Sequence, residues 1–243
     1  MPLDFTEAII LRTFPSREMD KIVVFFSRDK GLLRGVAKGA RKFGNRFGSS
    51  LEPLSYVKIF YYEKERQDLL VISQCDLLES FLDLQSDFNL ACTLSYWAEL
   101  VEEFYPSRIR EEPLFRLLLA CLRALRLGNN RELLTRYFET WLLRLSGLLP
   151  ATQRCLHCRR PLRAPVWLSP KKDGFYCDPC AAEKKEPVPP ELLAFITWTK
   201  KAPPGKETSP FSEEQARRMA PPLRSILIFH LEKEPRSLRF LKA

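Results

Sequence analysis

Two pairs of cysteines restrict this sequence more than any other feature, because they require two separate turns to meet. Cys155 and Cys158 form one C-x-x-C pair and Cys177 and Cys180 form another, with 18 residues between the pairs. This spacing lets both thiolates of a pair reach one ion from a tight turn, and two such turns give the tetrahedral sulfur coordination that suits zinc. Four protein ligands leave no open position for water, so the expected site is structural. His157, inside the first pair, is the alternative ligand.

The remaining cysteines and the apolar runs indicate the cellular compartment of the protein. Cys75, Cys92 and Cys121 each stand alone in apolar surroundings, which makes an odd total of seven. This pattern is typical of a reduced cytosolic protein and not of a secreted disulfide scaffold. The longest uncharged run, 88–98, is well short of the roughly 18 residues that a spanning helix needs. The N-terminus lacks the apolar core of a secretory signal. We therefore expect a cytoplasmic protein with no membrane segment.

Five apolar or β-branched runs follow one another within residues 4–82. Turn signals separate them, including "RDKG" after the second run and the charged "EKERQD" after the fourth. Closely spaced short strands predict a small barrel or sandwich. Five strands in about 80 residues fit an OB-fold, although the pattern also allows an SH3-like barrel. The predicted strands are 8–14, 22–27, 32–37, 56–62 and 69–75.

From Leu84 onward the apolar period becomes that of a helix. The segments 88–105, 111–128 and 131–147 each carry an apolar face and end at a proline or glycine signal. Three such helices joined by short loops predict a bundle. We therefore expect an α+β chain of two domains, an OB-fold barrel over 1–82 and an all-α domain over 83–243.

The cysteines lie in a Pro- and Arg-rich insert, 150–188, of the helical domain. Helices are expected to resume at "PPELLAFITW", and Ser212 with Gln215 fits a capping box. Pro221 and Pro222 predict a break, with a last helix from about Leu223 to Leu231.

A basic segment joins the third and fourth predicted strands. The stretch "RGVAKGARKFGNRFGSSLEP", 34–53, has no acid until Glu52. Its glycines let a backbone approach a partner closely, and its aromatics can stack on bases. Cationic grooves with stacking aromatics hold single strands without sequence preference, and such binding weakens with salt. The candidate contacts are Arg34, Lys38, Arg41, Lys42, Phe43, Arg46 and Phe47.

Plainer interpretations of the basic residues stay open. The cations of 34–53 can form a solvated surface, and either phenylalanine can plug the end of the barrel. Around the cysteines, a basic rim can touch phosphates or simply keep a small insert soluble. This rim comprises Arg154, Arg159, Arg160, Arg163, Lys171 and Lys172. The net charge of +9 favours polyanionic partners such as nucleic acid, an acidic protein tail or an anionic membrane surface.

The sequence offers little for catalysis. Its two histidines, His157 and His230, have no obvious nucleophile partner, and neither G-x-S-x-G nor H-E-x-x-H occurs. The stretch "PPGKETS" lacks the first glycine of a phosphate loop and has Glu207 after Lys206. We therefore expect a protein that is not an enzyme.

Several segments together resemble the RecO family of bacterial recombination mediators. "EAIILRT", "MDKIVVFFSRDKGLLRGVAKGARK" and "RFGSSLEP" are similar to the family's N-terminal barrel. "LSGLLPATQRCLHC" followed by "CDPC" resembles its helical domain with a zinc insert, and "EKEPRSLRFL" resembles its C-terminal signature. The resemblance covers nearly the whole chain in the right order.

The resemblance implies an N-terminal OB-fold, a helical domain that holds zinc on the four paired cysteines, and no catalytic site. Family members bind single- and double-stranded DNA and anneal complementary strands. With RecR they load RecA onto strands coated by single-strand-binding protein, whose acidic tail they also bind. By position, the barrel-loop cations become the DNA contacts, and a cytoplasmic, nucleoid-associated protein is expected. Arg224, Lys233, Arg236 and Arg239 are weaker candidates for the acidic tail.

Two other classes of function remain. A zinc-containing transcription or RNA-binding module would bind one duplex sequence or RNA selectively. An enzyme with an unrecognised site would keep its turnover after the barrel-loop cations are removed.

Overall fold

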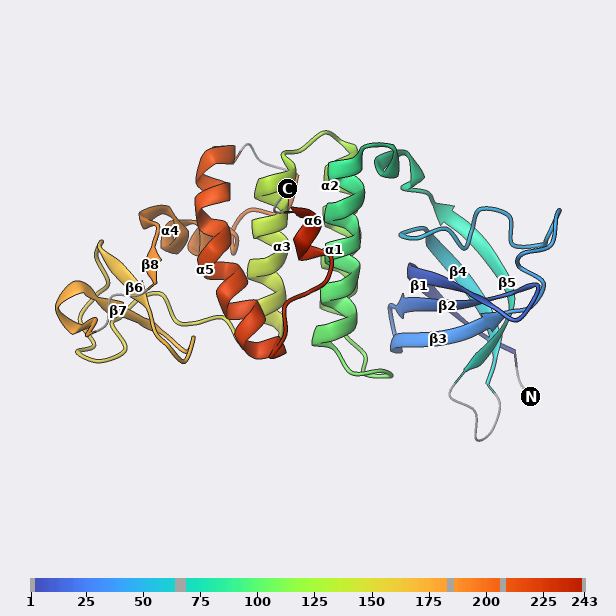
Figure 1. Ribbon diagram of the computed structural model, residues 1–243, viewed down its shortest axis with the longest axis horizontal. Coiled ribbons are helices and arrows are strands. Elements are labelled where there is room, and N and C mark those ends of the chain that lie inside the picture. The colour runs from blue at the N-terminus through green and yellow to red at the C-terminus, as the bar shows by residue number, and fades with distance from the viewer. Residues whose placement is uncertain (1–2, 64–68, 183–185, 206–208, 242–243) are drawn as a thin grey trace. The chain divides into compact units, whose positions relative to one another are not determined.

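The computed structural model describes residues 3–63, 69–182, 186–205 and 209–241 (Figure 1). The chain divides into two compact units. Unit 1 comprises Met1–Leu122 together with Arg236–Ala243, and unit 2 comprises Arg123–Pro235. The C-terminal segment therefore packs with the N-terminal part of the chain.

Five strands of unit 1 form a closed barrel in the order β1-β2-β3-β5-β4. All neighbouring strands are antiparallel except β3 and β5, which run parallel, and β1 closes the barrel on β4. This arrangement is the predicted OB-fold and not the SH3-like alternative. The strands are β1 (Leu3–Ser16), β2 (Asp20–Ser27), β3 (Gly31–Ala37), β4 (Tyr56–Tyr62) and β5 (Leu70–Glu79).

The barrel interior is filled by alternate residues of each strand, as the period of two requires. Ile10, Val23, Phe25, Ile59 and Ile72 are among the fully buried members of this core. Burial of such side chains stabilises a fold by about 1.5–3 kcal/mol each. The barrel core therefore gives unit 1 a rigid frame on which its loops are held.

The segment after the barrel packs back onto it. The η1 turn (Leu82–Ser86) leads into α1 (Phe88–Phe104), and α2 (Glu112–Arg126) follows. The ring of Phe115 in α2 lies 6.3 Å from Phe26 and 6.0 Å from Tyr56 of the barrel. Gly31 has a φ of +69°, and a Cβ there would lie 1.9 Å from the carbonyl oxygen of Ile109. The β2–β3 turn therefore requires glycine for this close approach.

Glu99 of α1 anchors the C-terminal segment of unit 1. Its carboxylate accepts hydrogen bonds from the backbone amides of Arg236 and Ser237 at 2.9 and 2.8 Å, and from the Ser237 hydroxyl. The short helix α6 (Leu238–Leu241) then packs against α1, with Leu238 fully buried. Burial opposes the ionisation of Glu99, but these hydrogen bonds outweigh it and lower the pKa of the carboxyl.

Unit 2 is mainly helical. Its helices are α3 (Arg131–Leu145), α4 (Pro190–Trp198) and α5 (Glu213–Leu231). Figure 1 shows α3 beside α5, and the two helices are in contact along their apolar faces. The predicted capping box is confirmed, because Ser212 and Gln215 bond reciprocally at the start of α5. The four long predicted helical segments, 88–105, 111–128, 131–147 and 189–198, correspond to α1 through α4.

The predicted break at Pro221 and Pro222 is wrong. Both prolines lie inside α5, which runs unbroken from Glu213 to Leu231. Two prolines remove two helical hydrogen bonds and each disfavours a helix by about 3 kcal/mol. However, Met219, Leu223 and Ile226 are fully buried on both sides of the prolines. Continuous packing of this apolar stripe holds the helix together across the prolines.

The cysteine insert folds as a small sheet in unit 2. Its strands are β6 (Val166–Leu168), β7 (Phe175–Cys177) and β8 (Pro187–Val188), and the turn η2 is Asp178–Cys180. The strand order is β7-β6-β8, and all pairs are antiparallel. Strands of two or three residues bury little apolar surface, so this sheet needs further support.

The compact units do not follow the predicted division between strands and helices. Unit 1 extends beyond residue 82 to include α1 and most of α2. The boundary between a barrel domain, 1–82, and a helical domain, 83–243, stays a prediction. No helix in the described part of the chain has the length and hydropathy needed to cross a bilayer.

The Glu99 contact predicts a stability change that depends on pH. The pKa of this carboxyl is lower when folded, so its contribution is present above the ordinary value near 4.5 and is lost as pH falls below it. We expect Glu99→Ala to lower the free energy of unfolding at pH 7 by about 1–3 kcal/mol, measured by urea denaturation. The difference from wild type should shrink towards pH 3. The exposed acid Asp83, changed to Ala, is the matched control; an equal loss there would contradict the assignment.

Candidate nucleic-acid interface and metal site

The connection between β3 and β4, residues 38–55, is an ordered series of turns that we call the strap. Backbone hydrogen bonds link successive turns, including Lys42 N to Gly39 O at 3.0 Å and Ser50 N to Phe47 O at 3.0 Å. The strap is also tied to the β1–β2 turn, because Arg41 N donates to Met19 O at 3.0 Å. These bonds fix its path on the barrel.

Apolar side chains of the strap point into the barrel. Ala40, Phe47 and Leu51 belong to the barrel core and are at most 5% exposed. The guanidinium of Arg46 lies 4.6 Å from the centre of the Phe47 ring, and its Nε donates to the Ser73 carbonyl at 2.8 Å. One side of the strap therefore fills the end of the barrel with apolar side chains, and the guanidinium of Arg46 lies over the ring of Phe47.

The other side of the strap faces solvent. Among the described residues, Phe43 is the most exposed large apolar one, at 107% of its reference area. In the described part of the chain Arg34, Lys38 and Lys42 form no ion pair, and Arg41 bonds only a backbone carbonyl through its side chain, that of Glu18. The structure places Arg34 on β3 and the other four predicted cations, Lys38, Arg41, Lys42 and Arg46, on the strap, and all five are exposed.

A groove of about 780 Å³ lies between the strap and the β1–β2 turn. Two acids reach it, but the carboxylate of Asp20 is occupied by the amide of Gly39 at 2.8 Å. The β1–β2 turn was not predicted to contribute, because its only signal in the sequence is the short stretch "SREM" between two strands. The lining residues are Arg17, Glu18, Met19, Asp20, Lys38, Gly39, Lys42, Phe43, Gly44, Asn45 and Arg46.

The two phenylalanines of the strap have different environments. Phe47 is 3% exposed, so it could stack on a base only by leaving the core. The interpretation of a barrel plug fits this residue, and Phe43 alone offers a ring to a ligand. Sequence could not separate them, because both lie in similar basic, glycine-rich surroundings.

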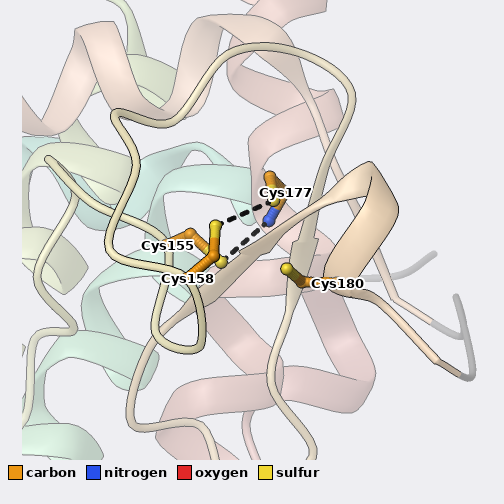
Figure 2. Close-up of side chains that lie close together, drawn as sticks. All are labelled: Cys155, Cys158, Cys177 and Cys180. Atoms are coloured by element: carbon orange, nitrogen blue, oxygen red, sulfur yellow. Dashed lines mark hydrogen bonds between the residues drawn. The ribbon is translucent and has the colours of Figure 1, made fainter.

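The four paired cysteines come together in unit 2 (Figure 2). Their sulfur atoms all lie within 4.8 Å of one another, and those of Cys158 and Cys177 are 3.6 Å apart. Tetrahedral zinc with bonds of about 2.3 Å would place its sulfur ligands about 3.8 Å apart, so the cluster fits a metal ion of this kind. His157 is exposed and lies outside the cluster.

Each cysteine pair sits on a tight turn. Cys155 N donates to Arg160 O at 2.8 Å and Arg159 N donates to Cys155 O at 3.0 Å, which closes the first turn. Arg159 takes a positive φ of 62° within it. The second turn begins at the end of β7, and Ala181 N donates to Cys177 O at 3.1 Å.

The first turn also prepares one sulfur to bind a cation. Burial opposes ionisation of Cys155, but the amides of Cys177, Cys158 and His157 outweigh it and lower the pKa of the thiol to about 6. The thiolate is the form that binds metal. Four thiolates so close would repel one another, so all four can ionise only around a cation. The site can therefore hold a metal ion and cross-link its two turns.

The basic rim of the insert is only partly a surface feature. Arg159, Arg160, Arg163 and Lys171 are exposed, as expected. Lys172 is 6% exposed and its ammonium pairs with Glu186, so it is part of the interior and not a free phosphate contact. Its positive φ of 57° places it in the β6–β7 turn, where the side chain folds inward.

Comparisons with known proteins match both halves of the chain. The family model "Recombination protein O N terminal" matches residues 1–81, and "Recombination protein O C terminal" matches residues 85–239. The protein "DNA repair protein RecO" of Koribacter versatilis is 40% identical over 71% of this chain and 70% of its own length. Proteins of the same name from Pelotomaculum thermopropionicum and Dehalococcoides mccartyi are 31% and 30% identical over 99% of this chain and 94% and 96% of their own.

The different positions of Phe43 and Phe47 predict different effects on stability. Phe47→Ala would leave a cavity in the barrel and should lower the free energy of unfolding by about 3–5 kcal/mol. Phe43→Ala removes an exposed ring and should change it by less than about 0.5 kcal/mol. Urea denaturation followed by circular dichroism measures both. Similar losses for the two variants would contradict the burial difference.

Proposed function

The chain belongs to the RecO family of DNA repair proteins, and from this membership we propose that it is a non-enzymatic mediator that binds single- and double-stranded DNA and anneals complementary strands. With RecR it would help load RecA onto strands coated by single-strand-binding protein. The exposed cations of the strap, beside an open groove, are the observation that carries the DNA-binding part of this proposal. The partner proteins are proposed from the family resemblance alone.

The strap suits a DNA backbone for three reasons. Its cations are exposed, as is Arg34 of the adjoining strand β3. Arg34, Lys38 and Lys42 have no ion pair among the described residues, so little electrostatic energy is lost when they meet phosphates. Its plug into the barrel fixes their positions, which reduces the entropy lost on binding. Phe43 supplies one exposed ring for a base. None of these contacts reads a base edge, so binding without sequence preference is expected.

The same charges explain how annealing would proceed. Two complementary strands repel each other through their phosphates, and cations on the protein lower that repulsion while the bases remain free to pair. No bond is made or broken in this process. The protein would therefore need positioned charge and no catalytic residues.

The four cysteines are proposed to hold a structural zinc ion. Zinc would supply a tetrahedral cross-link between the two turns of the insert and no chemistry. The acidic tail of single-strand-binding protein is a further proposed ligand, and its candidate contacts are Arg224, Lys233, Arg236 and Arg239. Of its weak candidates, Arg224 has a side chain only 16% exposed and 3.9 Å from Glu139, so it is the least suited.

Reversal of the strap charges tests the DNA-binding proposal. Lys38→Glu/Arg41→Glu/Lys42→Glu should weaken binding to labelled random-sequence single-stranded DNA and flatten its salt dependence. Each lost phosphate contact should reduce the slope of log K against log salt by about 0.7. Fluorescence anisotropy across a salt series measures both quantities.

A matched variant separates local from general charge effects. Arg116→Glu/Lys200→Glu/Lys201→Glu changes the net charge equally at exposed positions that belong neither to the strap nor to the lining of its groove. It should keep most of the affinity and slope. Equal losses in the two variants, or undiminished binding by the strap variant, would show that the strap is not the DNA contact. Binding confined to RNA or to one duplex sequence would favour a transcription or RNA-binding module.

The metal proposal predicts bound zinc at about one ion per chain by elemental mass spectrometry. Cys158→Ser should release it and lower the melting temperature, because the insert loses its cross-link. Cys92→Ala, outside the cluster, should keep the ion. Purified wild-type protein that holds no zinc, or holds a different metal after growth in zinc-containing medium, would contradict the assignment.

A further inference from the structure

One face of the three-stranded sheet in the insert carries a row of rings. Trp167 of β6 lies directly opposite Tyr176 of β7 and, on its other side, opposite Pro187 of β8. Side chains at opposite positions of antiparallel strands are about 4.5–5.5 Å apart at Cβ. The register therefore places Tyr176, Trp167 and Pro187 side by side across the sheet.

This face is the outer one. Val166 and Phe175 point the other way and are buried, whereas Trp167 and Tyr176 are half-buried. Both of these rings border a groove of about 740 Å³, a volume within the range of sites for small ligands. We call it the insert groove; it is also lined by His157, Pro170, Pro179 and Cys180.

The acids at the insert groove are already engaged. Glu186 pairs with Lys172 through one oxygen and accepts from the Ser225 hydroxyl at 3.1 Å through the other. Asp178 accepts from the indole nitrogen of Trp167 at 3.2 Å, which also fixes the ring. Glu186 is the one acid among the described lining residues, and its pairing with Lys172 offsets the charge that it would oppose to an anion.

Exposed cations lie next to lining residues of the groove in the sequence. Arg159 and Arg160 follow the cysteine turn that carries His157, and Lys171 stands between the lining residues Pro170 and Lys172. None of the three forms an ion pair with a described residue. Half-buried rings flanked by unopposed cations are the arrangement with which proteins hold unpaired bases and their phosphates.

We propose that the insert groove binds unpaired bases of single-stranded DNA, which stack on Trp167 and Tyr176 while Arg159, Arg160 and Lys171 contact the adjacent phosphates. This inference rests on the proposed DNA-binding function and adds a second contact, in unit 2. A proline-rich peptide also fits aromatic grooves. The surrounding cations favour the nucleic acid, since a neutral peptide would gain nothing from them.

The experiment compares two oligonucleotide probes on the full-length protein. One is a fluorescent oligothymidylate, and the other has the same length and charge but only abasic sites. Trp167→Ala should weaken binding of oligothymidylate about tenfold, a typical loss for one stacking contact. It should leave binding of the abasic strand unchanged. Tyr176→Ala should act in the same way.

Conservative variants separate stacking from folding. Tyr176→Phe keeps the ring and should bind as wild type does. Trp167→Phe keeps a ring but loses the hydrogen bond to Asp178, so it should retain most of the affinity. Zinc content and melting temperature, measured for each variant, show whether the insert stays folded. As a second readout, oligonucleotides containing 5-iodouracil should cross-link to Trp167 or Tyr176 in the wild-type protein.

The outcomes distinguish this inference from the proposed function. If the wild type binds neither probe, the DNA-binding function itself fails. If it binds both equally, the strap variant loses binding and the cross-links avoid residues 155–187, then the function stands and the insert groove is not a base site. The same conclusion follows if Trp167→Ala abolishes binding of decaproline but not of oligothymidylate.

Discussion

The insertion of Phe47 and Leu51 into the barrel is the interaction on which the proposed DNA contact depends. A small barrel leaves an open end, and apolar side chains of the strap fill it. Because this burial holds the strap, its cations project from a fixed backbone and not from a loose loop. The apolar residues of the strap thus anchor it in the barrel, while its basic residues face solvent.

The insert faces a different problem, because it has too little apolar surface to fold by burial alone. Its sheet consists of strands of two or three residues. A cation held by four sulfurs would supply the missing stabilisation, and the pair Lys172–Glu186 adds a contact that reaches Ser225 of α5. The same turns that bring the sulfurs together also position His157 and Pro179 at the insert groove. Metal binding and the shape of the groove are therefore coupled.

Much of this molecule could be predicted from sequence, for identifiable reasons. Period-two runs and turn signals located the five strands, and the C-x-x-C spacing located the metal cluster, because these patterns are local. Three features depend on tertiary packing and were not visible. Helix α5 continues through Pro221 and Pro222 because its neighbours stay buried, Lys172 turns inward to Glu186, and Phe47 plugs the barrel while Phe43 does not. The row of rings in the insert also required the strand register.

The two proposed contacts would act on DNA in opposite ways. The strap offers mainly charge, so a strand held there keeps its bases free and can pair with a complement. A strand whose bases stack on Trp167 and Tyr176 is withheld from pairing until they leave the groove. Charge contacts weaken steeply with salt, whereas stacking contacts do so much less. Annealing should therefore depend on the strap, and retention of an unpaired strand at high salt should depend on stacking with Trp167 and Tyr176 in the insert groove. A protein with both can hold a strand and still release it to a complement, because base pairing competes directly with stacking but not with phosphate contacts.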